Sequence, residues 1–213
     1  MDEPTTTGLA PGHHPKRRRN AAATRQAILD SARLAFTRCG YDGVGVREIA
    51  QNAGVTAMLV NRYFGSKERL FEEVVEATLA TPGILRHELT RPDRTVATLA
   101  QNMARTLVAK TEPGVSPLDG ILLLIRSAAN PQAATILRDH AQQHLQPLVD
   151  ILSGPGAPQR AALLLAVIAG FQLMRQIIGL SALTEAEPAD LARQLEGLFQ
   201  SLTQGFPSEG SLR

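Results

Sequence analysis

Aromatic residues and cysteine are scarce in this chain of 213 residues, which has no tryptophan, two tyrosines, six phenylalanines and one cysteine. A core with so few rings must be built mainly from Leu, Ile, Val and Ala, and this composition favours helices over sheets. The single Cys39 can form no internal disulfide, so a reducing cytoplasm fits the chain best. We expect Cys39 to be a small buried residue, and we expect neither a metal nor a cofactor.

The chain also lacks the patterns of secretion, membrane insertion and catalysis. Its first 20 residues contain no apolar signal-peptide core. The longest apolar run, Ala161–Phe171, is too short to span a bilayer and is interpreted as a buried helix. There is no glycine-rich phosphate loop, no Gly-x-Ser-x-Gly and no convergent carboxylate pair. We therefore expect a cytoplasmic protein that is neither an enzyme nor a partner of membranes.

Two histidines, His140 and His144, lie four residues apart on a predicted helix and could in principle share a metal ion. They have no Glu between them in zinc-protease register and no obvious third ligand. The pair therefore predicts no metal site.

Positive charge is concentrated in one part of the chain. Residues 16–69 hold eleven Lys and Arg against four Asp and Glu, whereas residues 70–213 hold eleven basic and fourteen acidic side chains. A basic module joined to a mildly acidic body indicates a polyanionic partner for the module alone. A basic surface that is merely solvated is the alternative, which charge by itself leaves open.

Apolar residues at spacings of three and four predict an all-α chain. Gly40 and Gly54 are expected to end helices, and Ser66 to cap the start of one. Pro147 is expected to kink or stop the helix in which it falls. The predicted helices begin near Thr24 and then cover Val46–Ala53, Thr56–Tyr63, a segment from Ser66 to Pro82, and the regions near 94–110, 117–129, 131–152, 158–180 and 188–205.

The stretch IAQNAGVTAMLVNRYF, residues 49–64, predicts two short helices joined at a glycine. Ile49, Val55 and Val60 can form a small core between them, and Gly54 supplies the left-handed conformation of a sharp turn. This is the helix-turn-helix geometry, which places the second helix in the major groove of DNA. An ordinary helical hairpin is the alternative, but DNA binding is favoured by the polar and basic residues around one side: Arg47, Gln51, Asn61, Arg62 and Lys67.

Residues 24–71 together resemble the N-terminal domain of the tetracycline-repressor (TetR) family of bacterial regulators. The residues in family register are Phe36, Gly40-Tyr41, Ile49-Ala50, Ala53-Gly54-Val55, Phe64 and Ser66-Lys67-Glu68. The sequence departs from the family pattern at Gly45, where a Ser or Thr cap is usual, and at Ala57, Met58 and Asn61 of the recognition helix. The DNA-reading surface is therefore less basic and more apolar than is typical of the family.

The resemblance implies a homodimeric repressor with a three-helix DNA-binding head and a helical body for ligand binding and dimerisation. We expect a disordered leader with a basic arm (1–19), a helix-turn-helix domain (20–66), a ligand-binding and dimerisation domain (67–205) and a tail (206–213). The expected partners are a palindromic double-stranded DNA operator, a second copy of the chain and an unknown small apolar or amphipathic ligand.

The residues expected to contact DNA differ in what each side chain can do. Thr56 is a helix cap, a contact or both, and Ala57 can touch thymine methyl groups. Met58 is either a core residue or a second partner of those methyl groups. Asn61 matches adenine, and Arg62 suits guanine or a phosphate. The others are phosphate contacts and a basic arm, which either enters a minor groove or attracts DNA non-specifically: Tyr63, Lys67, Arg47, Thr24, Lys16, Arg17, Arg18 and Arg19.

The helices near 158–180 and 188–205 are expected to form the dimer. Apolar residues nearly encircle the first of them, which must therefore be buried on several sides. With their copies the two helices would make a four-helix interface, and an intrachain core is the alternative.

A ligand cavity is expected among the helices of 94–152 and 158–180. For each candidate, an ordinary role as a core or surface residue is the favoured alternative. The apolar candidates are Met103, Leu107, Leu124, Leu137 and Phe171, and the polar anchors are Arg126, His140, Gln172 and Arg175.

These features predict a sequence-specific transcriptional regulator, most simply a repressor that leaves its operator when a ligand favours another conformation of the body. The alternative is a DNA-binding regulator that needs no ligand or that activates transcription. An activator fits the same sequence, because the sign of regulation depends on where the operator lies relative to the promoter.

Overall fold

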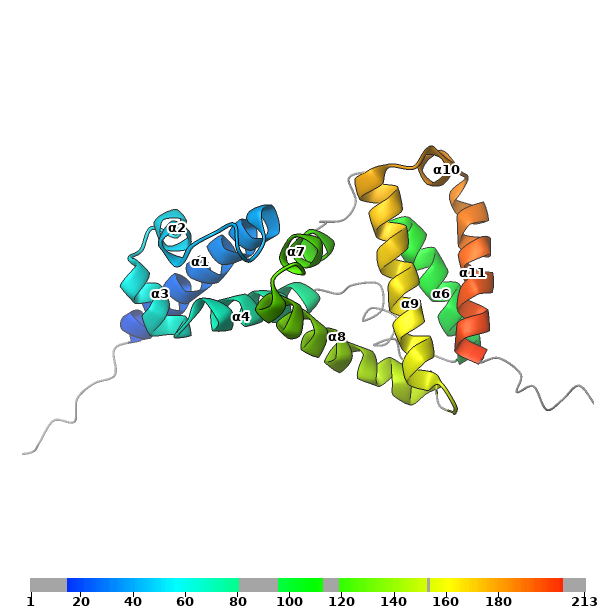
Figure 1. Ribbon diagram of the computed structural model, residues 1–213, viewed down its shortest axis with the longest axis horizontal. Coiled ribbons are helices and arrows are strands. Elements are labelled where there is room, and N and C mark those ends of the chain that lie inside the picture. Colours follow the sequence, from blue (N-terminus) through cyan, green and yellow to red (C-terminus); the bar gives the residue numbers. More distant parts are fainter. Residues whose placement is uncertain (1–14, 81–95, 113–118, 153, 205–213) are drawn as a thin grey trace, which may run out of the picture.

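The computed structural model describes residues 15–80, 96–112, 119–152 and 154–204. Every regular element within these ranges is a helix, so the prediction of an all-α chain is confirmed (Figure 1). In chain order the elements are α1 (Pro15–Cys39), α2 (Val46–Asn52), α3 (Ala57–Phe64), α4 (Lys67–Ala80), α6 (Val96–Lys110), α7 (Asp119–Ser127), α8 (Pro131–Leu152), α9 (Ala157–Gln172), the π-helical segment η1 (Leu173–Ile178), α10 (Ser181–Thr184) and α11 (Pro188–Gln204).

The first helix is longer than the sequence pattern predicts. It begins at Pro15 rather than near Thr24, so the basic residues 16–19 form its first turns instead of an irregular arm. Proline is tolerated in the first turn of a helix, and Lys, Arg and Ala are good helix formers, which explains the earlier start. The rest of the predicted leader and the predicted tail lie outside the described residues.

The apolar stripe of α1 is buried as predicted except at its end. Ile28, Ala32 and Phe36 are fully buried, whereas Cys39 is exposed, so the expectation of a buried thiol is wrong. The helix ends at Gly40, which has the left-handed conformation of a C-terminal cap with a φ of +73°. At this end of the helix it is Gly40 that is buried. Cys39 is left on the outer side of the last turn.

The helices α1 to α4, together with α7 and the start of α8, surround one apolar cluster, which we call the head core. It comprises Ile28, Ala32, Ala35, Phe36, Tyr41, Val44, Ile49, Ala50, Val60, Phe64, Leu70, Phe71, Val74, Val75, Leu123 and Ala133. Three of its rings pack together, with Phe71 lying 5.1 Å from Phe36 and 5.0 Å from Tyr41, both edge to face. The core of the head therefore extends past residue 66 into three further helices.

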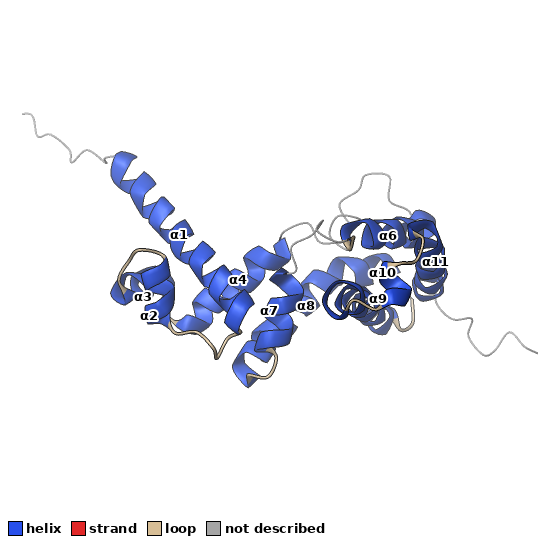
Figure 2. Ribbon diagram, turned by 90° about the horizontal axis from the view of Figure 1, so that it is seen from above, coloured by secondary structure: helices blue, strands red, loops and turns tan. Residues whose placement is uncertain are grey.

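A second cluster, the body core, lies at the other end of the molecule (Figure 2). It is formed by α6, α9, α11 and the last turns of α8, with residues Leu99, Ala100, Met103, Ala104, Leu107, Val108, Leu148, Leu152, Ala157, Ala161, Leu164, Ile168, Phe171, Leu191, Leu195, Phe199 and Leu202. α9 is interrupted after Gln172 by the π-helical segment, which sequence periodicity does not predict.

One helix, α8, belongs to both cores. Ala133 near its start is buried in the head core, whereas Leu148 and Leu152 near its end are buried in the body core. The helix covers the predicted range 131–152 and runs through Pro147, so of the predicted kink or stop the stop is wrong. The packing of the two leucines that follow outweighs the hydrogen bond that a proline removes.

The buried Arg160 holds the ends of two body helices together. Arg160 donates to the carbonyl oxygens of Leu202 and Thr203 (both 3.2 Å) and of Leu152 (3.3 Å). These carbonyls belong to the last turns of α11 and α8, where intrahelical partners are lacking and where a positive charge is favoured. The guanidinium group of Arg160 therefore joins two helix C-termini.

Candidate nucleic-acid interface

The α2–α3 pair forms a compact helix-turn-helix on the surface of the head. Val55 N–H bonds the Ala50 carbonyl (2.9 Å) across the turn, and Gly54 has the predicted left-handed conformation with a φ of +68°. Ser31 of α1 donates its hydroxyl to the carbonyl of Ile49 (2.9 Å), which holds α2 against α1. One side of α3 therefore packs against the head, and its other side is free.

The free face of α3 carries residues that can read DNA. Val60 and Phe64 point into the head core, whereas Asn61 and Arg62 are exposed. Met58 is 80% exposed, so it is not a core residue and the alternative of a surface contact stands. Because a long apolar side chain gains nothing by standing in water, its exposure on this face suits contact with thymine methyl groups.

The residues at the two ends of α3 differ in how exposed they are. Thr56 has the extended conformation of an N-cap but makes no side-chain capping bond, which leaves its hydroxyl available for DNA. Ala57 and Tyr63 are half-buried and pack against the head core. Each of these two side chains can therefore expose only part of its surface to DNA.

The outlying DNA candidates fall into three groups. Arg47 is exposed at the start of α2, as a phosphate contact requires. Lys67 and Thr24 already have partners in the chain, since the Lys67 Nζ lies 4.4 Å above the Tyr41 ring and the Thr24 hydroxyl donates to the Asn20 carbonyl (2.8 Å). The basic residues 16–19 lie in the first turns of α1, and their side chains are outside the described set.

Sequence reasoning missed Arg25, which holds three helices of the head together. Its guanidinium group from α1 stands 4.7 Å above the Phe64 ring of α3 and pairs with Glu73 of α4. An arginine on the polar side of a helix carries no sequence signal for such a role, because its partners are distant in the chain.

Tyr41 and Glu68 form a polar link beside the start of α4. The Tyr41 hydroxyl donates to the Glu68 carboxylate (3.1 Å), and burial is the main cause that raises the Tyr41 pKa to about 12. A hydrogen bond from Ser66 is the main cause that lowers the pKa of Glu68, with further contributions from its own backbone N–H and from Tyr41. Because the pKa of the Glu68 carboxyl is lowered, the hydrogen bond between Tyr41 and the charged carboxylate stabilises the head at neutral pH. This stabilisation is lost as the pH falls below the pKa of Glu68 and the carboxylate is protonated.

The end of α7 is tied to the turn between α1 and α2. The Tyr41 backbone N–H donates to the Ser127 hydroxyl (3.1 Å), and Asn130 donates to Asp42 (2.8 Å). Arg126, a predicted ligand anchor, instead donates to the Thr37 carbonyl of α1. These bonds fix α7 against the rear of the head.

The structure brings together only part of the set of residues predicted to line a ligand cavity. Met103, Leu107 and Phe171 are buried in the body core, while Leu137 packs on the head core and Leu124 is 46% exposed on α7. Gln172 is half-buried at the end of α9. His140 is one of the residues that line a pocket between α4 and α8.

Arg175, another predicted ligand anchor, is occupied within the body. It is buried in η1, where it donates to the Val108 carbonyl (2.8 Å) and to the Thr111 hydroxyl (3.0 Å) at the end of α6. Its positive charge therefore caps the C-terminus of that helix.

Two family descriptions match the chain. Residues 28–74 match "Bacterial regulatory proteins, tetR family", and residues 97–202 match "Tetracyclin repressor-like, C-terminal domain". Among curated relatives, the transcriptional regulator AcrR of Shigella flexneri is 37% identical over 73 residues, and RutR of Escherichia coli K12 is 38% identical over 64 residues. The matched segment covers 34% of this chain and of AcrR, and 30% of this chain and of RutR, so the chain matches about a third of each relative's length.

Solved structures share the fold over much longer stretches. Salmonella enterica GusR superimposes with a TM-score of 0.69 at 20% identity, covering 85% of this chain and 96% of that one. A TetR-family regulator of Streptomyces coelicolor gives 0.56 at 22% identity, covering 92% and 100%. The multidrug binding protein EbrR, solved with proflavin, gives 0.54 at 21% identity, covering 84% and 99%. At these identities the likeness is one of fold alone.

Proposed function

This chain belongs to the TetR family of bacterial transcriptional regulators, which are DNA-binding proteins and not enzymes, and from that premise we propose that it is a homodimeric, sequence-specific repressor. The free face of α3 carries the proposal, because Met58, Asn61 and Arg62 stand exposed on a helix that the head core holds rigidly. In this proposal α3 enters the major groove. Thr56, Ala57, Tyr63, Arg47, Lys67, Thr24 and residues 16–19 would then touch its edges and the phosphates.

The Arg62→Ala variant is expected to bind operator DNA about 1–3 kcal/mol more weakly than the native protein, because it loses a bidentate contact to guanine or a phosphate pair. The measurement is footprinting and titration of the purified protein on fragments of its own upstream region at about 0.15 M salt. A protected site with two-fold symmetry is the expected result.

Arg138→Ala is the matched control, since Arg138 is an exposed arginine of α8 that lies outside the proposed interface. It should leave the affinity unchanged. Equal weakening by both variants would mean that arginine charge alone attracts the DNA. Diffuse, salt-sensitive binding to every fragment would reject a specific operator in this region.

We also propose that α9 and α11 form the dimer interface. The helix of residues Ala157–Ile178 is long and apolar enough to span a bilayer by length and composition alone, yet only 22% of its most apolar window is buried within one chain. Leu163 on α9 is 49% exposed, and Leu198 on the neighbouring α11 is 55% exposed. A second copy would cover this apolar surface, and it would also match the two-fold symmetry of an operator.

The Leu198→Glu variant is expected to raise the dimer dissociation constant by roughly a hundredfold or more, because an unpaired buried carboxylate costs several kcal/mol. Light scattering coupled to gel filtration measures the effect. Leu124→Glu is the control, since Leu124 has similar exposure on α7, away from α9 and α11. A dimer that survives Leu198→Glu but not Leu124→Glu would place the interface elsewhere.

A small ligand that prefers another arrangement of the body would release the protein from DNA by its differential affinity for the two states. Screening compounds against the footprinted fragment tests this step. If none lowers the affinity, a ligand-independent regulator fits better. A reporter gene placed under the protected site would distinguish repression from activation.

A further inference from the structure

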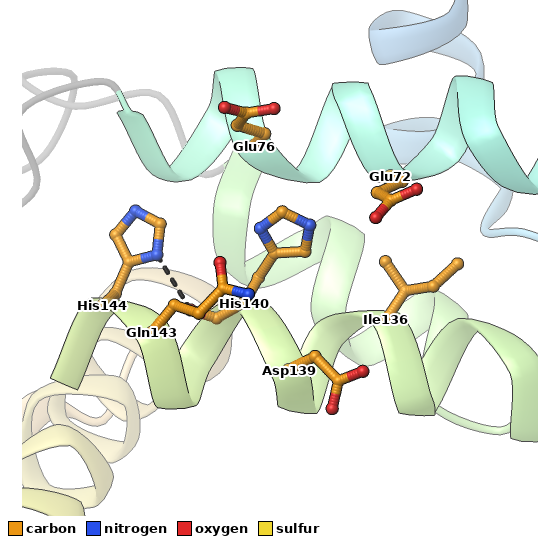
Figure 3. Close-up of a pocket in the computed structure, with 7 residues that line it drawn as sticks. All are labelled: Glu72, Glu76, Ile136, Asp139, His140, Gln143 and His144. Atoms are coloured by element: carbon orange, nitrogen blue, oxygen red, sulfur yellow. Dashed lines mark hydrogen bonds between the residues drawn. The ribbon is translucent and has the colours of Figure 1, made fainter. Parts of the chain in front are cut away.

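A polar pocket of about 360 Å³ lies between α4 and α8, on the path from the head to the body (Figure 3). It does not belong to the proposed DNA interface or to the proposed dimer surface. Its polar lining comes from both helices, with Glu72 and Glu76 on α4 and Asp139, His140, Gln143 and His144 on α8.

The charge of this pocket is negative and uncompensated. Three of its lining residues are carboxylates, and none of them is Lys or Arg. Glu72 and Glu76 are four residues apart on one face of α4, a spacing at which like charges destabilise a helix. Neither carboxylate has an ion-pair partner within the described part of the chain, and both are exposed. A cationic ligand would reach them directly and remove their repulsion.

A second observation, independent of the carboxylates, also points to a ligand. His140 is only 8% exposed, and its ring makes no hydrogen bond to any described residue. Figure 3 shows the ring rising from α8 towards α4, into the space below Glu72 and Glu76. The His140 ring nitrogens are not among the buried atoms of the described residues that lack a partner, so they face the open pocket, where a polar group that enters can bind them.

The neighbouring His144 also offers an acceptor. Its Nδ1 lies 2.8 Å from the His140 carbonyl oxygen. Because a carbonyl only accepts, Nδ1 must carry the proton, and the Nε2 of the neutral ring is then an acceptor. The pocket therefore presents acceptors and negative charge, which favours a ligand rich in N–H donors.

The described residues include no group of three or more His, Cys, Asp or Glu that could hold a metal ion. We propose instead that the pocket binds a small organic cation with two or more protonated amino groups, such as an aliphatic diamine. One ammonium group would bind Glu72 and Glu76, and the other would bind the His140 ring and the acceptors of α8. The alkyl chain would lie against Ile136, the one apolar residue of the lining.

Such a ligand would join α4, which follows the helix-turn-helix, to α8, which enters both cores. It would stabilise the arrangement of these helices that forms the pocket, and so bias the position of the head. This regulatory consequence rests on the proposed function, whereas the binding itself does not.

The test is calorimetric titration of the full-length protein, without DNA, with 1,4-diaminobutane at constant ionic strength. We expect one saturable site per chain, at least tenfold weaker binding of 1-aminobutane, and no binding of succinate. The Glu72→Gln/Glu76→Gln variant should bind the diamine at least tenfold more weakly, whereas Glu187→Gln, which changes an exposed carboxylate between α10 and α11, should bind it normally.

A titration that does not saturate by about 10 mM diamine would overturn the proposal, as would an unchanged affinity in the double variant. His140→Phe keeps a ring in place but removes its acceptor, and it should weaken binding several-fold. Tyrosine fluorescence and circular dichroism confirm that each variant is folded. If the double variant does not fold, the His140→Phe result decides the proposal alone.

The regulatory step needs its own control, because diamines also bind DNA phosphates. Diamine should change the DNA affinity of the native protein more than that of the Glu72→Gln/Glu76→Gln variant, and the difference measures the contribution of the pocket. Equal changes would reject regulation through this pocket. If the protein bound no DNA at all, the proposed function would fail, while calorimetry would still decide whether the site exists.

Discussion

The Gly40→Ala variant is expected to lose about 2–5 kcal/mol of stability and to loosen the contact between the head and α7. Gly40 has a φ of +73°, which alone costs an L-residue about 1–2 kcal/mol. A Cβ at this position would also lie 2.2 Å from the main-chain oxygen of Arg126 and 2.8 Å from its carbonyl carbon. Since both atoms are backbone, α7 itself must shift.

Urea unfolding followed by tyrosine fluorescence measures this loss within the head, because both tyrosines of the chain, Tyr41 and Tyr63, lie there. Gly54→Ala is the matched control. Its φ is +68°, but a Cβ there would meet no atom within 4 Å, so only the conformational cost of about 1–2 kcal/mol is expected. Equal losses in the two variants would show that the contact with α7 yields without cost.

The second large effect is expected from Phe71→Ala, which should cost about 3–5 kcal/mol. Phe71 is fully buried, and its ring packs edge to face against Phe36 and Tyr41. Alanine would leave a cavity between α1 and α4, and the packing of the head core that holds α3 would weaken. DNA affinity should fall with the population of folded heads.

Phe199→Ala removes an equally buried ring from the body core and serves as the comparison. In thermal or urea unfolding, Phe71→Ala should shift the tyrosine signal first, whereas Phe199→Ala should act mainly on the circular dichroism of the body. A loss below about 1 kcal/mol in Phe71→Ala would contradict the cavity argument. Coincident shifts of both probes in both variants would show that the two cores unfold as one.

The sequence predicted the turn of the helix-turn-helix and the cap of α4 accurately because their signals are local. Gly54 takes the left-handed conformation that its place in the turn requires, and the Ser66 hydroxyl accepts the Arg69 N–H (3.2 Å) as an N-cap should. The two faces of α3 follow from helical periodicity, which separates Val60 from Asn61 and Arg62. The prediction that Cys39 is buried was wrong because Cys39 is the last residue of α1, where the apolar stripe of the helix no longer faces the core.

The body was predicted less well because its interactions join distant segments. An arginine such as Arg175 has the same sequence signal whether it binds a ligand or caps α6, and only the fold shows which carbonyl it meets. Apolar periodicity also could not show that Met103 and Leu137 serve different cores. The polar pocket between α4 and α8 escaped notice for a related reason, since five residues of α8 and two glutamates of α4 are adjacent only in space.

The shared helix α8 has a mechanical consequence. A helix of its 22 residues is about 33 Å long, so a tilt of about 10° about one end displaces the other by about 6 Å. In a two-fold dimer the heads would be displaced in opposite senses, and their separation would change by up to about twice that distance. The half-sites on DNA repeat only every 34–36 Å or so along the helix axis. A rotation that leaves both cores intact would then be enough to put the two recognition helices out of phase with consecutive major grooves.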